Sequence, residues 1–154
     1  MQFPKAILLA IASVACVHAA ETHKVNVGES NLSFSPEEIK AAKGDTIEFH
    51  FFSSNHDAVM GLADKPCEPM GMMDGSFASG VPQGDQVKQV FRVEVNSTEP
   101  ALVFCSVGMH CANGMVMAIN PNGEKTATKF KDAARGKSSK APEGVYGGTW
   151  GNAA

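Results

Sequence analysis

The sequence predicts an all-β fold, an antiparallel β-sandwich or β-barrel. Three observations predict it: short segments alternate apolar and polar residues, turn residues separate these segments, and helical segments do not recur between them. The chain has 154 residues, a length that suits one domain with its own buried core.

The N-terminus has the three-part layout of a secretory signal peptide. Lys5 precedes an apolar run from Ala6 to Val17, which is too short to span a bilayer comfortably. Small residues follow, and we expect cleavage after Ala19 or Ala20. Residues 1–20 are therefore assigned to the signal peptide, and the mature protein is expected to be secreted, extracellular or in the cell wall.

Three segments in the first third of the mature chain alternate as half-buried strands do: residues 23–27, 32–34 and 46–51. Residues 35–39 instead resemble a capped turn of helix, with Ser35 as cap and a proline in the first position. Residues 43–45 predict the turn into the next strand.

The middle of the chain begins with a long loop. Residues 61–86 are rich in Gly, Pro, Asp and Met and predict irregular structure with at most short helical turns. Alternation returns over residues 86–95. Residues 102–104 and 114–119 predict two further strands, and a loop of unusual composition joins them.

Composition changes after Pro121, at the end of the predicted β-domain (residues 21–121). Residues 125–154 carry six basic side chains against two acidic ones, whereas residues 21–124 carry fourteen acidic and six basic ones. A short helix over residues 126–134 is expected, followed by a flexible segment from Gly136 onward. Residues 122–154 are thus predicted to be a flexible, basic, Gly- and Lys-rich C-terminal tail.

The loop after the strand at 102–104 carries Cys105, His110 and Met115 at intervals of five. A soft thiolate, an imidazole and a weak thioether suit a copper ion that exists in two oxidation states. His56 follows a strand-like run and is the candidate for the missing ligand. Together the four side chains form the two-His, one-Cys set with an axial Met that is typical of electron-transfer copper sites.

The cysteine count is odd in the mature chain. Cys16 leaves with the signal peptide, and Cys67, Cys105 and Cys111 remain. If Cys67 bridges Cys111, then Cys105 is a lone thiolate that a metal ion could protect from oxidation. An intermolecular disulfide or an inert buried thiol is the alternative from the count alone.

Spacing weighs against other metal sites. Cys105 and Cys111 have five residues between them, whereas a binuclear copper centre needs three, and the chain has none of the His-X-His pairs of multicopper oxidases. A structural zinc site made by Cys67, Cys105, His110 and Cys111 is an alternative, but it leaves Met115 unexplained.

The region from about His23 to Pro121 resembles cupredoxins, in particular phytocyanins and fungal extracellular cupredoxin-like proteins. The resemblance rests on the order Cys, four residues, His-Cys, two residues, Gly-Met, and on residues 43–49, 55–56, 77–80 and 118–121. One departure is residues 102–103, where fungal relatives often have an aromatic residue.

The resemblance implies a Greek-key β-barrel. It also implies one type 1 (blue) copper ion as cofactor, held by His56, Cys105, His110 and Met115, with a disulfide between Cys67 and Cys111. Because the protein then fills the coordination shell, we expect single-electron transfer and no enzymatic activity.

We expect a monomer that docks transiently with a redox partner protein around the edge of His110, where Val107 and Met109 are apolar. No nucleic-acid partner and no membrane span are expected. The basic tail is expected to be solvated, with association to an anionic cell-wall polymer as the alternative.

Two other functions stay open: extracellular copper acquisition or buffering, and an interaction module on the same scaffold. Residues 70–73, Met-Gly-Met-Met, resemble a cuprous-ion-binding stretch and motivate the first. The simpler interpretation is that methionines pack a loop or form an adaptable apolar surface. Asn31 and Asn96 begin N-glycosylation tripeptides.

Overall fold

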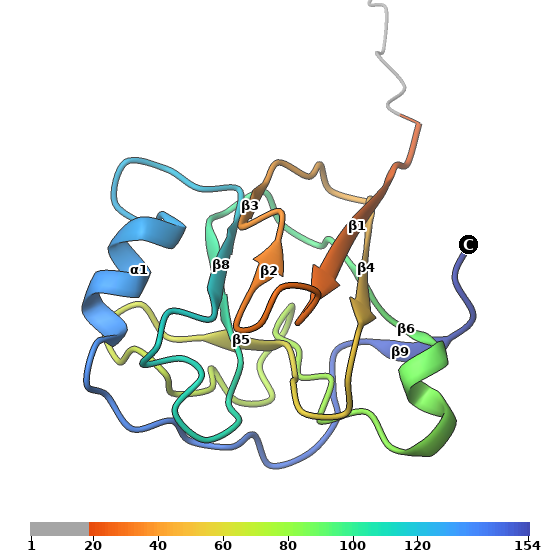
Figure 1. The fold of residues 1–154 in the computed structure, drawn as a ribbon. Helices are drawn as coiled ribbons and strands as arrows, with labels where there is room; N and C mark the ends of the chain where they lie inside the picture. Colours follow the sequence, from red (N-terminus) through yellow and green to blue (C-terminus); the bar gives the residue numbers. More distant parts are fainter. Residues whose placement is uncertain (1–18) are drawn as a thin grey trace, which may run out of the picture.

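The computed structural model describes residues 19–154 (Figure 1). The predicted signal peptide lies outside the described residues, apart from the exposed Ala19 and Ala20, and so does Cys16. Within the described part of the chain, no helix is long and apolar enough to cross a membrane.

Two β-sheets and a single α-helix make up the regular structure of residues 19–154, and the predicted all-β fold is confirmed. One sheet has the strand order β2-β1-β4-β6-β9 and the other the order β3-β8-β7-β5. The elements are β1 (Thr22–Val27), β2 (Phe34–Ser35), β3 (Glu38–Ile39), β4 (Thr46–Phe51), β5 (Val59–Gly61), the 3-10 helix η1 (Gly84–Lys88), β6 (Val90–Glu94), β7 (Ala101–Phe104), β8 (Val116–Ile119), α1 (Ala127–Ala134) and β9 (Thr149–Gly151).

The sheets are mixed, whereas the sequence predicted antiparallel pairing. β1 pairs with β4 in parallel, and β3 pairs with β8 in parallel; the other strand pairs are antiparallel. Parallel neighbours need a crossover connection. The chain provides it between β1 and β4, because it passes through β2 in one sheet and β3 in the other before it returns.

The predicted helical turn at residues 35–39 is wrong. The segment is extended, with a cis peptide bond between Ser35 and Pro36 and one short strand on each side of it. Phe34 and Ile39 are both buried in the core between the sheets. Long-range pairing of β2 with β1 and of β3 with β8 thus overrides the local capping pattern.

Two apolar clusters stabilise the fold. The larger one fills the space between the sheets, where alternation along the strands points side chains such as Val25, Phe49 and Phe91 inward. Each such side chain contributes about 1.5–3 kcal/mol when fully buried. The second cluster lies between the sheet β3-β8-β7-β5 and α1, and it includes Phe104 and Phe130.

The long middle loop contains more structure than predicted. β5 has only three residues, too few for a recognisable alternation, and the sequence analysis missed it. Residues 86–89, expected to begin a strand, belong instead to the end of η1 and its cap, so β6 begins at Val90.

The C-terminal segment differs most from expectation. The short helix expected over residues 126–134 is present as α1, and it begins after Thr126, whose side chain accepts a hydrogen bond from the Lys129 N–H. Beyond the helix, however, the chain is not a flexible tail. Its residues 149–151 form β9, an edge strand antiparallel to β6, and in Figure 1 the segment runs along the molecule from α1 to this strand.

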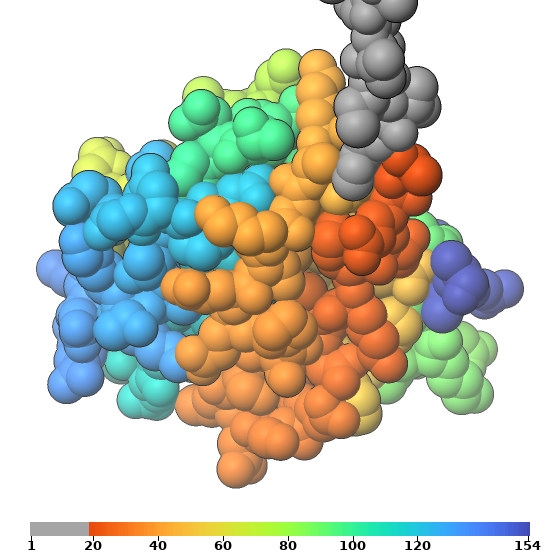
Figure 2. Space-filling model, turned by 90° about the horizontal axis from the view of Figure 1, so that it is seen from above, coloured from red at the N-terminus to blue at the C-terminus, as the bar shows by residue number. Residues whose placement is uncertain are grey.

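Ion pairs join the basic tail to the acidic body. Lys131 pairs with Glu37, and Lys140 pairs with Glu68 at 2.7 Å. In Figure 2 the helix region (blue) lies against the segment that carries β3 (light orange). The excess of basic charge therefore complements acidic side chains of the same molecule.

Candidate metal centre

The four predicted ligands come from two adjacent loops of the fold. His56 lies in the loop between β4 and β5, Cys105 follows β7 directly, His110 lies in the turns after it, and Met115 immediately precedes β8. β5 and β8 both pair with β7. The strand pairing thus brings the loop of His56 beside the loop that carries the other three residues.

His56, Cys105 and His110 form a cluster that could hold a metal ion. One potential ligand atom from each lies within 4.8 Å of the others. The Cys105 Sγ atom is 3.3 Å from Nδ1 of His110 and 3.9 Å from Nδ1 of His56. The two rings are 5.0 Å apart between centroids, with 45° between their planes.

Burial differs between the two imidazoles. His56 and Cys105 are buried, whereas His110 is half-buried. The cluster therefore reaches the protein surface through His110.

Met115 closes the loop. Its N–H donates to the carbonyl of His110 at 2.9 Å, and its carbonyl accepts a hydrogen bond from the Cys105 N–H at 3.1 Å. The side chain is fully buried in the same core cluster as Cys105. These contacts place Met115 at the base of the metal loop; its role as a ligand stays a prediction.

Gly28 makes room for the His56 ring. A Cβ atom at position 28 would lie 2.2 Å from Cδ2 and 2.5 Å from Nε2 of His56, and Gly28 has φ +74°. Both the contact and the backbone conformation require glycine.

A buried carboxyl group joins the two ligand loops. Asp57, next to His56, accepts hydrogen bonds from the Ser106 N–H at 2.6 Å and from the Ser106 hydroxyl. Burial raises the pKa of Asp57, and the hydrogen bonds from Ser106 partly offset this rise. The contact fixes the spacing of His56 and Cys105, because each ligand is adjacent in sequence to one partner.

The Cys105 thiol is strongly biased toward its protonated form. Burial, followed by the nearby Asp57 carboxylate, raises the pKa of Cys105 to about 12. A cation bound between the imidazoles would have to displace this proton, because the thiolate is the ligand.

The disulfide between Cys67 and Cys111 is present, with 5.9 Å between the Cα atoms. Cys105 is the free cysteine of residues 19–154. The disulfide excludes the four-ligand zinc site, since two of its thiolates are unavailable. It also ties His110, the neighbour of Cys111, to the middle loop, and closing a loop of 44 residues stabilises a fold by about 4 kcal/mol.

The sequence analysis missed the residues that support the ligands. Asp57 and Ser106 each follow a predicted ligand, so adjacency could have drawn attention to them. Gly28 carried no comparable signal, because its contact with His56 depends on the packing of the loop after β1 against the loop after β4.

The predicted glycosylation sites and two methionines of the middle loop lie at the surface. Asn31 and Asn96, the predicted glycosylation sites, are both exposed. Met72 and Met73 are 65% and 62% exposed, so they do not pack the loop that carries them.

No family model matches the chain. A curated relative, the probable GPI-anchored cupredoxin-1 of Arthroderma benhamiae, is 37% identical over 149 residues, which are 94% of this chain and 76% of the relative. The chain belongs to the cupredoxin family. This cupredoxin is also 39% identical over 153 residues to an extracellular serine-rich protein of the same fungus, and the match covers 96% of this chain but only 58% of that protein.

Solved structures similar to this chain include a pseudoazurin and an auracyanin. Pseudoazurin from Hyphomicrobium denitrificans is 17% identical with a TM-score of 0.47, covering 73% of this chain and 93% of that one. Auracyanin from Roseiflexus castenholzii has the same identity of 17% and TM-score of 0.47, covering 66% and 97%.

Proposed function

We propose that this cupredoxin is a secreted protein that binds one copper ion and transfers single electrons. The observation that carries the proposal is the cluster of His56, Cys105 and His110, whose ligand atoms lie within 4.8 Å of one another. Two imidazoles and a thiolate are the equatorial donors of electron-transfer copper sites.

The donor set fits copper better than zinc. Zinc in a structural site takes four imidazole or thiolate ligands. Here only three such side chains come together, and the fourth candidate is the thioether of Met115. A copper ion at this site would supply one-electron redox chemistry. We propose His56, Cys105 and His110 as its main ligands and Met115 as a weak fourth.

The protein's own groups would keep the site rigid. The hydrogen bonds between Asp57 and Ser106 hold the two ligand loops together, and the disulfide at Cys111 restrains the loop of His110. A ligand set that moves little between two oxidation states favours rapid electron exchange. If Met115 also binds the ion, four protein donors would leave no open coordination position for a substrate.

We propose that electrons pass through the exposed edge of His110. Met109 beside it is 52% exposed, and Val107 is partly exposed. The tail extends this surface, because Val107 and Val145 line the same depression. A small apolar surface of this kind suits a weak, transient complex with a redox partner.

The names of the relatives, one extracellular and one GPI-anchored, support secretion or attachment to the cell surface for this chain as well. The exposed Asn31 and Asn96 are compatible with glycosylation in the secretory pathway. Two lysines of the tail already pair with Glu37 and Glu68 of the same molecule, which argues against the tail as a binding site for an anionic cell-wall polymer.

An optical spectrum of the copper-loaded protein tests the proposal. We expect an intense visible absorption from thiolate-to-copper charge transfer, one copper per chain, and a reversible one-electron wave. Cys105→Ser should abolish the colour, whereas Ser138→Ala, at an exposed position outside the cluster, should keep it. A colourless copper complex, or colour retained without Cys105, would contradict the proposal.

A second variant tests the proposed route of the electron. Val107→Asp adds a charge beside His110 without touching a proposed ligand, so it should preserve the spectrum and slow exchange with an apolar redox partner. Unchanged exchange rates with every partner tried would count against docking at this surface.

A further inference from the structure

Four methionines lie outside the His56–Cys105–His110 cluster, on or beside the loop of residues 71–76: Met60, Met70, Met72 and Met73. This loop leaves the edge of β5 and returns to it. The Met60 carbonyl accepts a hydrogen bond from the Met70 N–H, and the Met60 N–H donates to the Phe77 carbonyl, both at 2.9 Å. Met60 thus lies at the neck of the loop, and Met70 is the residue from which the loop departs.

Met60 and Met70 are cross-strand partners. Gly61 and Pro69 form an antiparallel bridge, and the Leu62 N–H donates to the Glu68 carbonyl. In this register Met60 stands directly opposite Met70. Opposite residues of an antiparallel pair point to the same face with their Cβ atoms about 5 Å apart, so the two thioethers share one side of the ladder.

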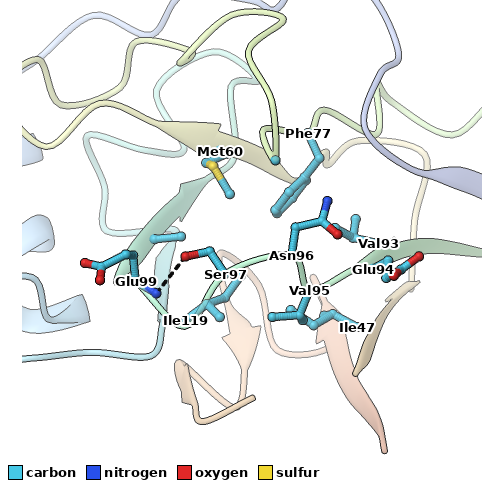
Figure 3. A pocket seen from close by; sticks show the side chains of 12 residues that line it. Ile47, Met60, Phe77, Val93, Glu94, Val95, Asn96, Ser97, Glu99 and Ile119 are labelled. Carbon is cyan, nitrogen blue, oxygen red and sulfur yellow. Dashed lines mark hydrogen bonds between the residues drawn. The ribbon is translucent and has the colours of Figure 1, made fainter. Parts of the chain in front are cut away.

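The two side chains are half-buried and line one open depression. Its rim also carries the carboxylates of Asp74 and Glu99 and one ammonium group, that of Lys125. On the inner side, Met60 points into an apolar pocket of about 70 Å³ whose walls include Phe77 and Ile119 (Figure 3). The sulfur of this flexible side chain therefore has room to reorient.

The loop itself is held in one compact turn. The Ser76 hydroxyl lies 2.6 Å from the Gly71 carbonyl and 2.7 Å from the Met73 carbonyl, and the Met73 N–H donates to the Gly71 carbonyl. This turn carries Met72 and Met73, whose side chains are exposed and which closely follow Met70 in the sequence.

We propose that Met60 and Met70 form a binding site for a soft monovalent cation, Cu⁺, separate from the His56–Cys105–His110 cluster. Thioethers are soft, neutral donors that select Cu⁺ over harder cations. The carboxylates of Asp74 and Glu99 favour a positive charge in the depression. The site goes beyond electron transfer and does not depend on it, because the two sites share no residue.

Silver ion tests the site, because Ag⁺ is a redox-inert soft cation. The full-length, disulfide-bonded protein is labelled at its methionine methyl groups and titrated with Ag⁺ while the methyl resonances are followed by NMR. The signals of Met60 and Met70, assigned with Met60→Leu and Met70→Leu, are expected to shift together. They should do so during a second equivalent, after the Cys105 thiolate has taken the first.

The double variant Met60→Leu/Met70→Leu should lose one bound Ag⁺ per chain. Leucine conserves volume and apolar character, so the fold should be retained. Met72→Leu/Met73→Leu is the matched control and should keep both equivalents. The proposal is overturned if the Met60 and Met70 signals do not shift, if the Met60/Met70 variant still binds two Ag⁺ ions, or if the control variant binds only one.

Competition with a Cu⁺ chelator measures the affinity of the proposed site for Cu⁺ itself. The Met60/Met70 double variant should hold the second Cu⁺ at least tenfold more weakly than the parent, and equal affinities would overturn the assignment to Cu⁺. Failure of the Cys105 site would look different, because the methionine signals would then shift with the first equivalent.

Discussion

At the scale of single residues, the position of His56 depends on neighbours that do not bind metal. The ring is buried, and its Nδ1 atom faces Cys105 while its Nε2 edge lies over Gly28. Asp57 anchors the adjacent backbone to Ser106. The position of the His56 ring is thus set by a missing Cβ atom on one side and a buried hydrogen-bonded carboxyl group on the other.

Gly28→Ala should displace His56. The variant has a backbone cost of about 1–3 kcal/mol for the positive φ, and in addition its methyl group overlaps the ring. Gly44→Ala is the control, because Gly44 has φ +94° but no atom within 4 Å of an added Cβ.

We expect both glycine variants to unfold at lower urea concentration than the parent, with Gly28→Ala the less stable. Only Gly28→Ala should also weaken or shift the visible absorption of the copper-loaded protein. Matching spectra and matching stabilities for the two variants would show that Gly28 does not position the ring.

At the scale of elements, β9 converts the C-terminal tail into part of a sheet. Trp150 packs against Phe51 and Phe91, with ring centroids 5.2 and 5.5 Å away, and its indole N–H donates to the Ser79 carbonyl at 3.1 Å. Ser79 in turn accepts a hydrogen bond from the Ala58 N–H through its hydroxyl. The tail is therefore linked through Ser79 to the segment that follows His56 and Asp57.

Gly147→Ala should detach β9. An added Cβ would lie 1.8 Å from the Ser76 carbonyl oxygen, and backbone atoms cannot yield as a side chain can. Because Trp150 is the single tryptophan of the chain, its fluorescence emission reports the detachment and should shift to the red.

Gly144→Ala provides the comparison for Gly147→Ala, since nothing lies within 4 Å of a Cβ at position 144. Its emission should match that of the parent. An unshifted emission in Gly147→Ala would mean that the tail can rearrange around the methyl group without leaving the sheet.

At the scale of the whole molecule, one buried carboxylate joins two strands to the C-terminus. Glu48 on β4 pairs with Arg92 on β6 at 2.8 Å and with His50 at 3.1 Å, and it accepts a hydrogen bond from the Ala154 N–H at 3.0 Å. Burial alone would raise the pKa of Glu48, but the hydrogen bonds from Ala154, Arg92 and His50 outweigh it and lower the pKa.

The lowered pKa makes part of the stability dependent on pH. The folded-state pKa of Glu48 lies below its ordinary value of 4.5, so its contribution is fully present above the unfolded-state pKa. It is lost as the pH falls through the folded-state pKa. At neutral pH, Glu48→Gln should therefore lower the free energy of unfolding by about 2 kcal/mol.

Urea unfolding of parent and Glu48→Gln between neutral pH and acid measures this effect. The difference between the two proteins should narrow as the pH falls below the ordinary range of a glutamate. A difference that stays constant across the series would assign the stability to packing rather than to charge.

Much of the site could be predicted from the sequence, because its chemistry is local. Cys105, His110 and Met115 lie on one loop, and an odd number of cysteines in a chain expected to be secreted indicates a thiol with a special role. The pairing of Cys67 with Cys111, implied by the family resemblance, is confirmed. The supporting contact of Gly28 with His56 could not be predicted, since it joins two loops that are close only after folding.

The fold was predicted in class but not in detail. Alternation is a local property and it indicated β1 and β4, while short apolar runs indicated β7 and β8. β9 was missed because a three-residue strand next to glycines has no period to detect. The helical turn expected at residues 35–39 was wrong for a related reason: its capping pattern is weaker than the burial of Phe34 and Ile39.

The sequence by itself determined which side chains carry soft donor atoms, how the cysteines are spaced and which segments alternate as strands. These properties belong to a side chain or to a few neighbours along the chain. The tertiary structure alone decided that β1 and β4 are parallel, that the basic tail contributes β9 and that Met60 lies opposite Met70 in the backbone pairing. Each of those features depends on contacts between residues that are distant in the sequence. Such contacts stabilise the protein only after the sheets have formed.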